Sequence, residues 1–462
     1  MPIIKSISGI RGTLGEKMGE GLDPVLIVQY CLAFATLLKT ENKKKITVVV
    51  GRDGRVSGEI FESLVVSAMR AAGADVIQTG YTTTPTLEMA VIMSKADAGI
   101  ILTASHNPAN WNALKFFNKN GEFISPETGK KLLELIEKND FICADEKNLG
   151  SISYDDTFMH KHVEAVLNLP IINKKAIADA GFFVVADVIN STGGLILPIL
   201  FDALNVKYKI INNSDYGKFA HNPEPLPQHL TELSSEVVAN KADLGISVDP
   251  DVDRLALICE NGEMFGEEYT LVAAADFVLS HKIGNTVSNL SSSQALKDIT
   301  LQKGGKYYAS AVGEVNVVNK MKEVDAVIGG EGNGGVIYPE LHYGRDAVVG
   351  IAIVLSLLAE RKKTISQIRK SYPEYFISKN KIELNPNTDL DNVLAEIEKK
   401  FAQSCENIIK IDGLKIEFKN EWVHLRKSNT EPIIRIYAES SSMEKANKIS
   451  EKFIEIILSI IK

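Results

Sequence analysis

Cysteine, long apolar runs and excess positive charge are all scarce in this sequence. Its 462 residues include four cysteines, and no Cys-x-x-Cys pair occurs among Cys31, Cys143, Cys259 and Cys405. This argues against a disulfide framework and a cysteine-based zinc site, and we interpret all four as buried free thiols. No run approaches the ~18 apolar residues that a membrane-spanning helix needs, so we expect a cytoplasmic protein with no membrane partner.

Acidic residues exceed basic ones. Asp and Glu total 59 against 51 for Lys and Arg, which gives a formal net charge of −8 and disfavours nucleic acid as a partner. Hydrophobic residues at 45% and charged residues at 24% are typical of globular protein, and the length predicts several domains. Oligomeric surfaces carry no readable signature, so a monomer and a homodimer both stay open.

Strands and helices alternate along most of the chain. A strand over 46–50, a loop over 51–55 and a helix over 60–72 begin this pattern, and similar units recur up to residue 363. Such alternation favours mostly parallel sheets covered by helices, whereas the short strands that follow predict a small α+β module. We expect an α/β fold of three related mixed-sheet domains, residues 1–152, 153–254 and 255–369, and a smaller α+β domain, residues 370–462.

Three carboxylates follow a predicted buried strand over 244–248. Asp249, Asp251 and Asp253 alternate along the chain, so on an extended backbone they would share one face, with Arg254 as an adjacent cation for phosphate. Carboxylate oxygens at this spacing are suited to Mg²⁺. The alternative interpretation is a solvated acidic turn that ends the strand.

A hydroxyl and an imidazole follow another predicted strand, at 98–102. Ser105 lies where open α/β sheets place their ligands, which makes it a candidate nucleophile. His106 is its neighbour, but adjacent side chains diverge on an extended backbone, so a Ser-His relay is geometrically poor. An Asn-Pro turn with a hydrogen-bonding serine is the competing interpretation.

Two further stretches are chemically unusual. The glycine-rich stretch 329–335 would let backbone approach a small ligand, with Glu331 and Asn333 available to bind hydroxyls. The glycines do not have the Gly-x-Gly-x-x-Gly spacing of a dinucleotide-binding motif in the right register. The Gly-Lys-Ser/Thr sequence of a phosphate-binding loop is also absent. The stretch 426–435 combines arginines, a lysine, hydroxyls and an amide, which is the chemistry of a phosphate cradle or of an exposed hairpin loop.

Five motifs, taken in order, closely resemble those of the α-D-phosphohexomutases. They are Ser8-Gly-Ile-Arg11-Gly12, Thr103-Ala-Ser-His-Asn-Pro108, Asp249-Pro-Asp-Val-Asp-Arg254, Gly330-Glu-Gly-Asn-Gly334 and Arg426-Lys-Ser-Asn-Thr-Glu-Pro432. The resemblance implies a heart-shaped protein with a central cleft. It also implies that a phosphoryl group on Ser105 passes to a hexose phosphate, and that a bound hexose 1,6-bisphosphate turns over and returns its other phosphoryl group to the serine.

The resemblance also implies a role for each site residue. Mg²⁺ is held by Ser105 with Asp249, Asp251 and Asp253, while Arg11, Lys115 and Arg254 lie beside the phosphoserine. Lys115 takes part in proton transfer, and His106 shapes the loop. Glu331 and Asn333 read the sugar hydroxyls. The non-reacting phosphate is held by the remaining residues, Arg426, Ser428, Asn429, Thr430 and Arg435.

Three positions depart from the common family pattern: Pro250, Asn333 and Lys427. With the segments 312–316 and 342–346 they resemble the phosphoglucosamine mutase and phosphomannomutase/phosphoglucomutase branch. We expect glucosamine 6-phosphate to be converted to glucosamine 1-phosphate, and the alternatives are a mutase for glucose or mannose phosphates, a silent sugar-phosphate binder and a phosphatase. The intact nucleophile and carboxylates argue against the binder.

Overall fold

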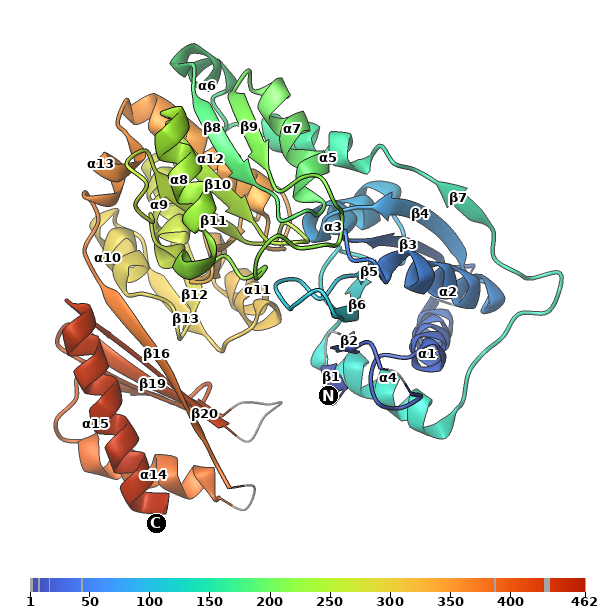
Figure 1. Ribbon diagram of the computed structural model, residues 1–462. Helices are drawn as coiled ribbons and strands as arrows, with labels where there is room; N and C mark the ends of the chain where they lie inside the picture. Colours follow the sequence, from blue (N-terminus) through green and yellow to red (C-terminus); the bar gives the residue numbers. More distant parts are fainter. Residues whose placement is uncertain are drawn as a thin grey trace. The chain divides into compact units, whose positions relative to one another are not determined.

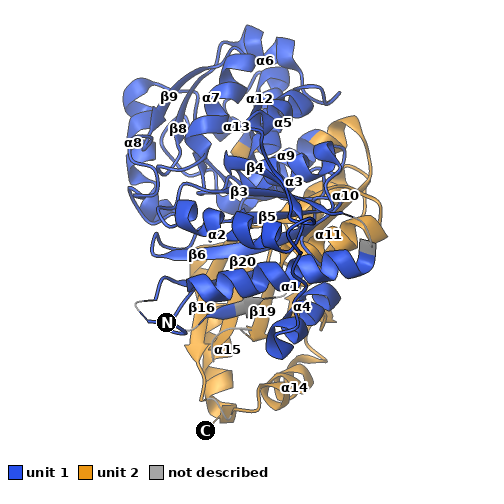
Figure 2. Ribbon diagram, turned by 90° about the vertical axis from the view of Figure 1, so that its right-hand side faces the viewer, with its two compact units in different colours: residues 1–277, 333–368 blue, residues 278–332, 369–462 orange. Residues whose placement is uncertain are grey.

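The chain folds into α/β units built on four β-sheets. The computed structural model describes residues 3–6, 9–15, 17–42, 45–385, 388–427 and 433–461 (Figure 1). Residues 1–277 and 333–368 form one compact unit, and residues 278–332 and 369–462 form a second (Figure 2).

The first unit opens with a mixed sheet of seven strands in the order β1-β2-β6-β5-β3-β4-β7. The strands are β1 (Ile4–Ser6), β2 (Gly9–Thr13), β3 (Thr47–Arg52), β4 (Asp75–Tyr81), β5 (Ala98–Leu102), β6 (Trp111–Asn118) and β7 (Ile152–Tyr154). Its helices are α1 (Pro24–Asn42), α2 (Gly58–Ala71), α3 (Thr84–Ser94) and α4 (Pro126–Lys138). Strand β6 runs antiparallel to both of its neighbours, so it breaks the simple alternation of parallel strands.

Alternating apolar residues explain why helices cover both faces of this sheet. Val48 and Val50 pack on the side of α1 and α2, whereas Val49 between them packs against α3. Phe116 and Phe117 divide in the same way. Side chains of successive strand residues point to opposite faces, so a continuous apolar strand is buried on both sides.

Helix α1 is apolar over most of its length. Its window Pro24–Glu41 has a mean hydropathy of 1.2, and by length and composition alone it could cross a membrane. The expectation that no segment approaches this length was therefore too strict. Ile27, Tyr30 and Phe34 of α1 lie in the hydrophobic core, and the Phe34 and Phe116 ring centroids are 4.7 Å apart. These contacts are those of a core helix that packs on a sheet.

The second sheet of this unit has the order β11-β10-β8-β9. Its strands are β8 (Phe183–Asp187), β9 (Lys207–Ile211), β10 (Leu244–Val248) and β11 (Leu255–Cys259). The other elements that lie wholly or mostly in this unit are α5 (Phe158–Leu167), α6 (Lys174–Ala180), α7 (Gly193–Ala203), the 3₁₀ helix Pro227–His229, α8 (Thr231–Asn240), α9 (Glu267–His281), β15 (Gly335–Ile337), α12 (Ala347–Arg361) and α13 (Ile365–Arg369). Strands β10 and β11 are antiparallel, with Val248 opposite Leu255, so residues 249–254 form the loop of a hairpin.

The second unit contains a parallel group and an antiparallel sheet. The parallel group comprises β12 (Asn285–Asn289), β13 (Tyr307–Ser310) and β14 (Ala326–Glu331), with α10 (Ala295–Gln302) and α11 (Glu314–Glu323). The antiparallel sheet has the order β16-β20-β19-β18-β17. Its elements are β16 (Phe376–Glu383), α14 (Leu390–Phe401), β17 (Asn407–Ile409), β18 (Leu414–Phe418), β19 (Glu421–Lys427), β20 (Ile433–Ser440) and α15 (Met443–Ile461). Helices α14 and α15 cover its apolar face.

The predicted fold class is confirmed, since α/β sheets are followed by a C-terminal antiparallel sheet with two helices. The four domain boundaries stay a prediction. The interpretation of the cysteines was wrong for half of them: Cys31 and Cys259 are buried, whereas Cys143 is exposed and Cys405 is half-buried. Helix α14 ends before Cys405, and Cys143 lies on the loop after α4, where no core surrounds it.

Candidate active site

Three buried carboxylates gather on the hairpin loop between β10 and β11. Asp249, Asp251 and Asp253 are each fully buried, and one carboxylate oxygen from each lies within 4.8 Å of the other two. The backbone N–H groups of Asp253 and Arg254 both donate to Asp249 Oδ1 at 3.1 Å, which curls the loop around this side chain. A cluster of hard oxygen ligands results.

The three carboxylates lie together as predicted, but the backbone that carries them is not extended. Val252 has a φ of +61°, a left-handed conformation that is strained for a β-branched residue. Its conformation is fixed by contacts on both sides. The carbonyl of Pro250 accepts bonds from Ser191 Oγ at 2.6 Å and Thr192 Oγ1 at 2.9 Å, and the Val252 carbonyl accepts from the Ala347 N–H at 3.2 Å.

The donor set and its unmet charge fit a divalent cation. Asp251 Oδ1 and Asp253 Oδ1 are buried and have no hydrogen-bond partner. Burial, together with the carboxylates of Asp253 and Asp251, raises the pKa of Asp249 well above its usual range. A buried group of like charges is unfavourable unless a cation balances it, and Mg²⁺ prefers such oxygens.

Ser105 lies directly against this cluster. Its Oγ donates to Asp249 Oδ2 at 2.7 Å, and the residue is 6% exposed. The residue has a φ of +48°, and its N–H donates to Thr103 Oγ1 at 2.9 Å. This turn directs the hydroxyl to the carboxylates, so the predicted nucleophile and the predicted metal ligands meet.

Arg55 forms hydrogen bonds to the loop that carries Ser105. The sequence analysis did not identify this arginine as a site residue. Its guanidinium donates to four backbone carbonyls, those of Ser105 (2.6 Å), Asn107 (2.7 Å), Pro108 (2.6 Å) and Trp111 (2.9 Å). Asp53 pairs with its Nε at 3.1 Å and also accepts from Thr103 Oγ1 at 2.7 Å. The sequence places Arg55 in a charged loop, residues 51–55, directly after a buried strand. No motif in that loop indicates a function for the arginine.

His106 lies closer to Ser105 than an extended backbone would allow. The left-handed turn at Ser105 brings its Oγ to 3.3 Å from His106 Nδ1, which corrects the expectation that the two side chains diverge. Burial, followed by the nearby cations Arg254, Arg345 and Arg11, lowers the pKa of His106 well below its usual range. The imidazole is therefore neutral and sits in a positively charged environment suited to phosphate.

Two cations neutralise part of the carboxylate charge. Lys115 Nζ is 2.8 Å from Asp251 Oδ2 and 4.0 Å from Asp253 Oδ2, and Arg345 Nη2 is 2.6 Å from Asp253 Oδ2. Burial alone would lower the pKa of Lys115, but the two carboxylates raise it.

Arg11 on β2 lies opposite Ala113 of β6. It therefore shares a sheet face with Lys115, which lies two residues further along β6. Arg345 is a site residue that sequence reasoning missed, because it was noted only as part of the segment 342–346.

The predicted sugar-binding residues occur in different units. Glu331, in the second unit, is buried, and its Oε1 accepts from Asn289 Nδ2 at 2.8 Å and the Gly313 N–H at 3.2 Å. Asn333, in the first unit, accepts from the Gly335 N–H at 3.3 Å. The first part of the glycine-rich stretch belongs to a strand, since β14 continues to Glu331. Gly329 is needed within the strand because a Cβ there would lie 2.5 Å from Met321 Sδ.

A row of cations crosses the antiparallel sheet of the second unit. Arg426 on β19 lies directly opposite Arg435 on β20, which in turn lies opposite Lys381 on β16. Like charges at opposite positions destabilise a sheet unless an anion binds them. Arg426 Nε has one carboxylate partner, Asp412, at 3.5 Å. The predicted residues Ser428, Asn429 and Thr430 lie outside the described residues.

Comparisons with known proteins identify the family of this chain. Four stretches match the phosphoglucomutase/phosphomannomutase family: residues 3–142 (alpha/beta/alpha domain I), 160–262 (domain II), 266–375 (domain III) and 384–456 (C-terminal domain). A phosphoglucomutase/phosphomannomutase of Thermococcus kodakarensis is 34% identical over 98% of both chains. A phosphoglucosamine/phosphogalactosamine mutase of Sulfurisphaera tokodaii is 31% identical over 97% of this chain and 98% of its own.

A solved structure extends the likeness to the whole fold. The crystal structure of a phosphoglucomutase/phosphomannomutase family protein from Burkholderia thailandensis has a TM-score of 0.85 and 25% identity, and the match covers 98% of this chain and 97% of that one. The chain therefore belongs to the phosphoglucomutase/phosphomannomutase family and is a phosphohexomutase, an isomerase.

Proposed function

We propose that this phosphohexomutase converts glucosamine 6-phosphate to glucosamine 1-phosphate through a phosphoserine at Ser105. The observation that carries the proposal is the 2.7 Å contact between Ser105 Oγ and Asp249, beside two further buried carboxylates. A serine hydroxyl placed against a cation site is arranged for phosphoryl transfer, in which positioning and charge stabilisation do most of the work.

The bond between Ser105 Oγ and phosphorus breaks as a sugar hydroxyl bonds to phosphorus, and the hydroxyl proton passes to a base of the site. This produces a hexose 1,6-bisphosphate, which turns over and gives its other phosphoryl group back to Ser105 Oγ. The sugar is released with its phosphate at the other position, so no phosphate is consumed and none is set free.

Residues of the first unit supply the charges for this step. Asp249, Asp251 and Asp253 would hold Mg²⁺, which when bound neutralises negative charge on the transferring phosphoryl group. Lys115 and Arg11 add positive charge on the same sheet face, and Lys115 is the group that we propose for proton exchange with the sugar hydroxyl. Arg254 and the neutral His106 complete the surroundings of the phosphoserine.

Residues of the second unit supply binding groups. The opposed Arg426 and Arg435 are proposed to bind the phosphate that does not react, since guanidinium groups match phosphate oxygens in pairs. Glu331, held by Asn289 and Gly313, is proposed to accept bonds from sugar hydroxyls. We propose that Asn333 also binds sugar hydroxyls, because it belongs to the same family motif as Glu331. We further propose that the protein acts in the cytoplasm, as a monomer or a homodimer.

We propose an amino sugar as the substrate, in preference to a neutral sugar, for two reasons. Asn333 and the loop around it resemble phosphoglucosamine mutases, and the Sulfurisphaera relative is named for glucosamine and galactosamine. The Thermococcus relative is named for glucose and mannose, so a phosphoglucomutase/phosphomannomutase is the second candidate.

Replacing the nucleophile tests the covalent step. In Ser105→Ala we expect mutase activity to fall at least ~1,000-fold, because the phosphoryl group has no acceptor on the protein. Mass spectrometry of the wild type after incubation with hexose 1,6-bisphosphate is expected to show one added phosphoryl group, absent from the variant. Ser63→Ala, at an exposed site on α2, is the matched control. Isomerisation that persists in Ser105→Ala would contradict the mechanism, and release of inorganic phosphate without isomerisation would identify a phosphatase.

Removing the divalent cation tests the carboxylate cluster. Chelation is expected to lower activity at least ~100-fold, and Mg²⁺ to restore it, because the phosphoryl charge is otherwise unbalanced. In metal-free buffer Asp249→Asn is expected to melt above the wild type, since one of three buried like charges is gone. Mg²⁺ is expected to raise the melting temperature of the wild type and of the exposed control Asp179→Asn, but not of Asp249→Asn. Equal stabilisation of all three proteins by Mg²⁺ would place the cation elsewhere.

Arg55→Lys tests whether the support of the serine loop matters. A lysine ammonium cannot reach four carbonyls as the planar guanidinium does, so we expect kcat to fall ~10- to 100-fold with KM little changed. Hydrogen exchange in residues 104–111 is expected to accelerate. Arg52→Lys, at a nearby arginine that pairs with Glu62 instead, is the control. Unaltered kcat together with faster exchange would show that the loop does not need this support.

Substrate preference is tested by comparing glucosamine 6-phosphate, glucose 6-phosphate and mannose 6-phosphate under one set of conditions. We expect kcat/KM for the amino sugar to be at least ~10-fold higher, a ratio typical of one recognised substituent. Each assay contains Mg²⁺ and a trace of the matching 1,6-bisphosphate. A higher kcat/KM for either neutral sugar would reject the substrate assignment and leave the mutase mechanism intact.

A further inference from the structure

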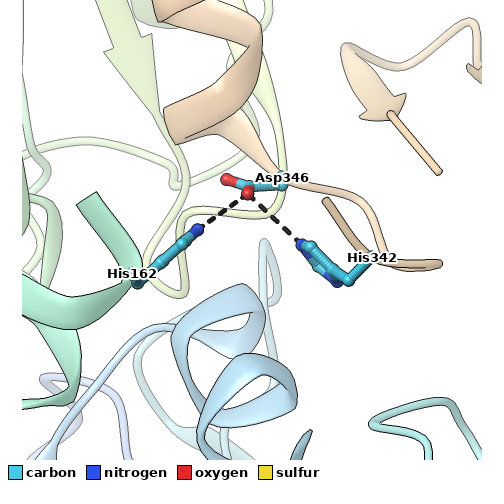
Figure 3. A group of neighbouring side chains, drawn as sticks. All are labelled: His162, His342 and Asp346. Atoms are coloured by element: carbon cyan, nitrogen blue, oxygen red, sulfur yellow. Dashed lines mark hydrogen bonds and ion pairs between the residues drawn. The ribbon is translucent and has the colours of Figure 1, made fainter. Parts of the chain in front are cut away.

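A second group of buried titratable side chains lies in the first unit, outside the carboxylate loop. His162 on α5, and His342 and Asp346 before α12, are all buried, and both imidazoles point to the carboxylate of Asp346 (Figure 3). His162 Nε2 is 2.9 Å from Asp346 Oδ2, and His342 Nε2 is 3.3 Å from the same oxygen. The proposed mutase mechanism uses none of these residues.

We propose that His162, His342 and Asp346 bind a structural Zn²⁺ ion. In a tetrahedral zinc site with bonds of ~2.0–2.1 Å, neighbouring ligand atoms are ~3.3 Å apart. The two imidazole-to-carboxylate distances are already close to this spacing, and all three ligand atoms lie within 4.8 Å of one another. The three side chains leave the fourth position of the tetrahedron for an oxygen donor.

The second nitrogen of each imidazole lies close to an oxygen atom of α3. His162 Nδ1 lies 3.0 Å from Thr86 Oγ1, and His342 Nδ1 lies 3.1 Å from Glu88 Oε2. Metal-bound histidines almost always donate the other ring N–H to a carboxylate, a backbone carbonyl or water, which fixes the ring and directs the free lone pair to the metal. Glu88 offers His342 such a carboxylate, and the Thr86 hydroxyl occupies the same place at His162. Both outer partners belong to α3, so the site joins α3, α5 and the start of α12.

Charge balance fits a divalent cation. Asp346 and Glu88 place two carboxylates in a buried region, and one Zn²⁺ with two neutral imidazoles makes the group neutral. Two protons on the imidazoles would balance the charge equally. However, Asp346 Oδ1 already accepts the N–H groups of Val348 and Val349, so both imidazoles converge on the single oxygen Oδ2. The two imidazole nitrogens and Asp346 Oδ2, all within 4.8 Å of one another, are three donors that a single ion could bind.

The ligand types separate this site from the carboxylate loop. Imidazole nitrogen selects zinc and other transition metals, whereas Mg²⁺ prefers oxygen. Excess Mg²⁺ should therefore occupy Asp249, Asp251 and Asp253 and leave the histidine site available to Zn²⁺ or to Co²⁺, its spectroscopic substitute. This inference does not rest on the proposed substrate.

The test measures metal content and spectrum in three proteins: wild type, His162→Gln, and His160→Gln as control. His160 is an exposed histidine on the same helix, and glutamine at 162 can still hydrogen-bond to Asp346. After dialysis against Zn²⁺ with excess Mg²⁺, we expect about one bound zinc in the wild type and control, and less than about a tenth in His162→Gln. Co²⁺ is expected to give the intense visible bands of a four-coordinate site in the first two proteins only.

Heat denaturation provides a second reading on the same samples. Zn²⁺ at ~100 times its dissociation constant is expected to raise the midpoint of the wild type by roughly 5 °C and to leave that of His162→Gln unchanged. Absence of bound zinc in the wild type would overturn the proposal and identify a proton-balanced ion-pair network. Equal zinc content in the wild type and His162→Gln would overturn it as well, because the ion would then lie elsewhere.

Discussion

Burial of three carboxylates on one hairpin loop is the constraint on which the first unit depends. The β10–β11 pairing encloses Asp249, Asp251 and Asp253 away from water, where like charges raise each other's energy. Partial compensation comes from elsewhere in the chain: Lys115 from β6 and Arg345 from the segment before α12. Each compensating group belongs to a different element. Correct folding of the whole unit is therefore a condition for a stable carboxylate cluster, and the proposed divalent cation would complete the charge balance.

The side chain and the backbone of Ser105 have different partners. The hydroxyl of Ser105 faces the carboxylates, while its carbonyl is held by the buried guanidinium of Arg55. Asp53 fixes Arg55 and, through Thr103, the turn that gives Ser105 its left-handed conformation. The phosphoryl transfer proposed for Ser105 would benefit from such support, because a displacement of about 1 Å can cost ~100-fold in rate.

The sequence predicts what depends on local pattern and misses what depends on tertiary contact. Strands such as β5 and β10, and the residues at their ends, were predicted from apolar runs and the polar groups that follow them. Strand β6 was not predicted, and Lys115 entered only through family resemblance, because nothing local marks an antiparallel strand inserted in a parallel sheet. Arg55 was missed for the same reason: a single arginine has no motif, and its role appears only when four carbonyls surround it.

The segment 342–346 connects the two groups of buried charges. Arg345 bonds to Asp253 of the carboxylate loop, and the next residue, Asp346, bonds to His162 and His342 while it caps α12. Adjacent side chains of an extended segment point to opposite sides, and Asp346 has an extended conformation. The position of Arg345 is thus tied to the rigidity of its neighbour. Whatever balances the charge of Asp346, two protons or a zinc ion, also fixes the guanidinium that neutralises Asp253. The stability of the histidine site and the electrostatics of the carboxylate loop therefore depend on the same short segment.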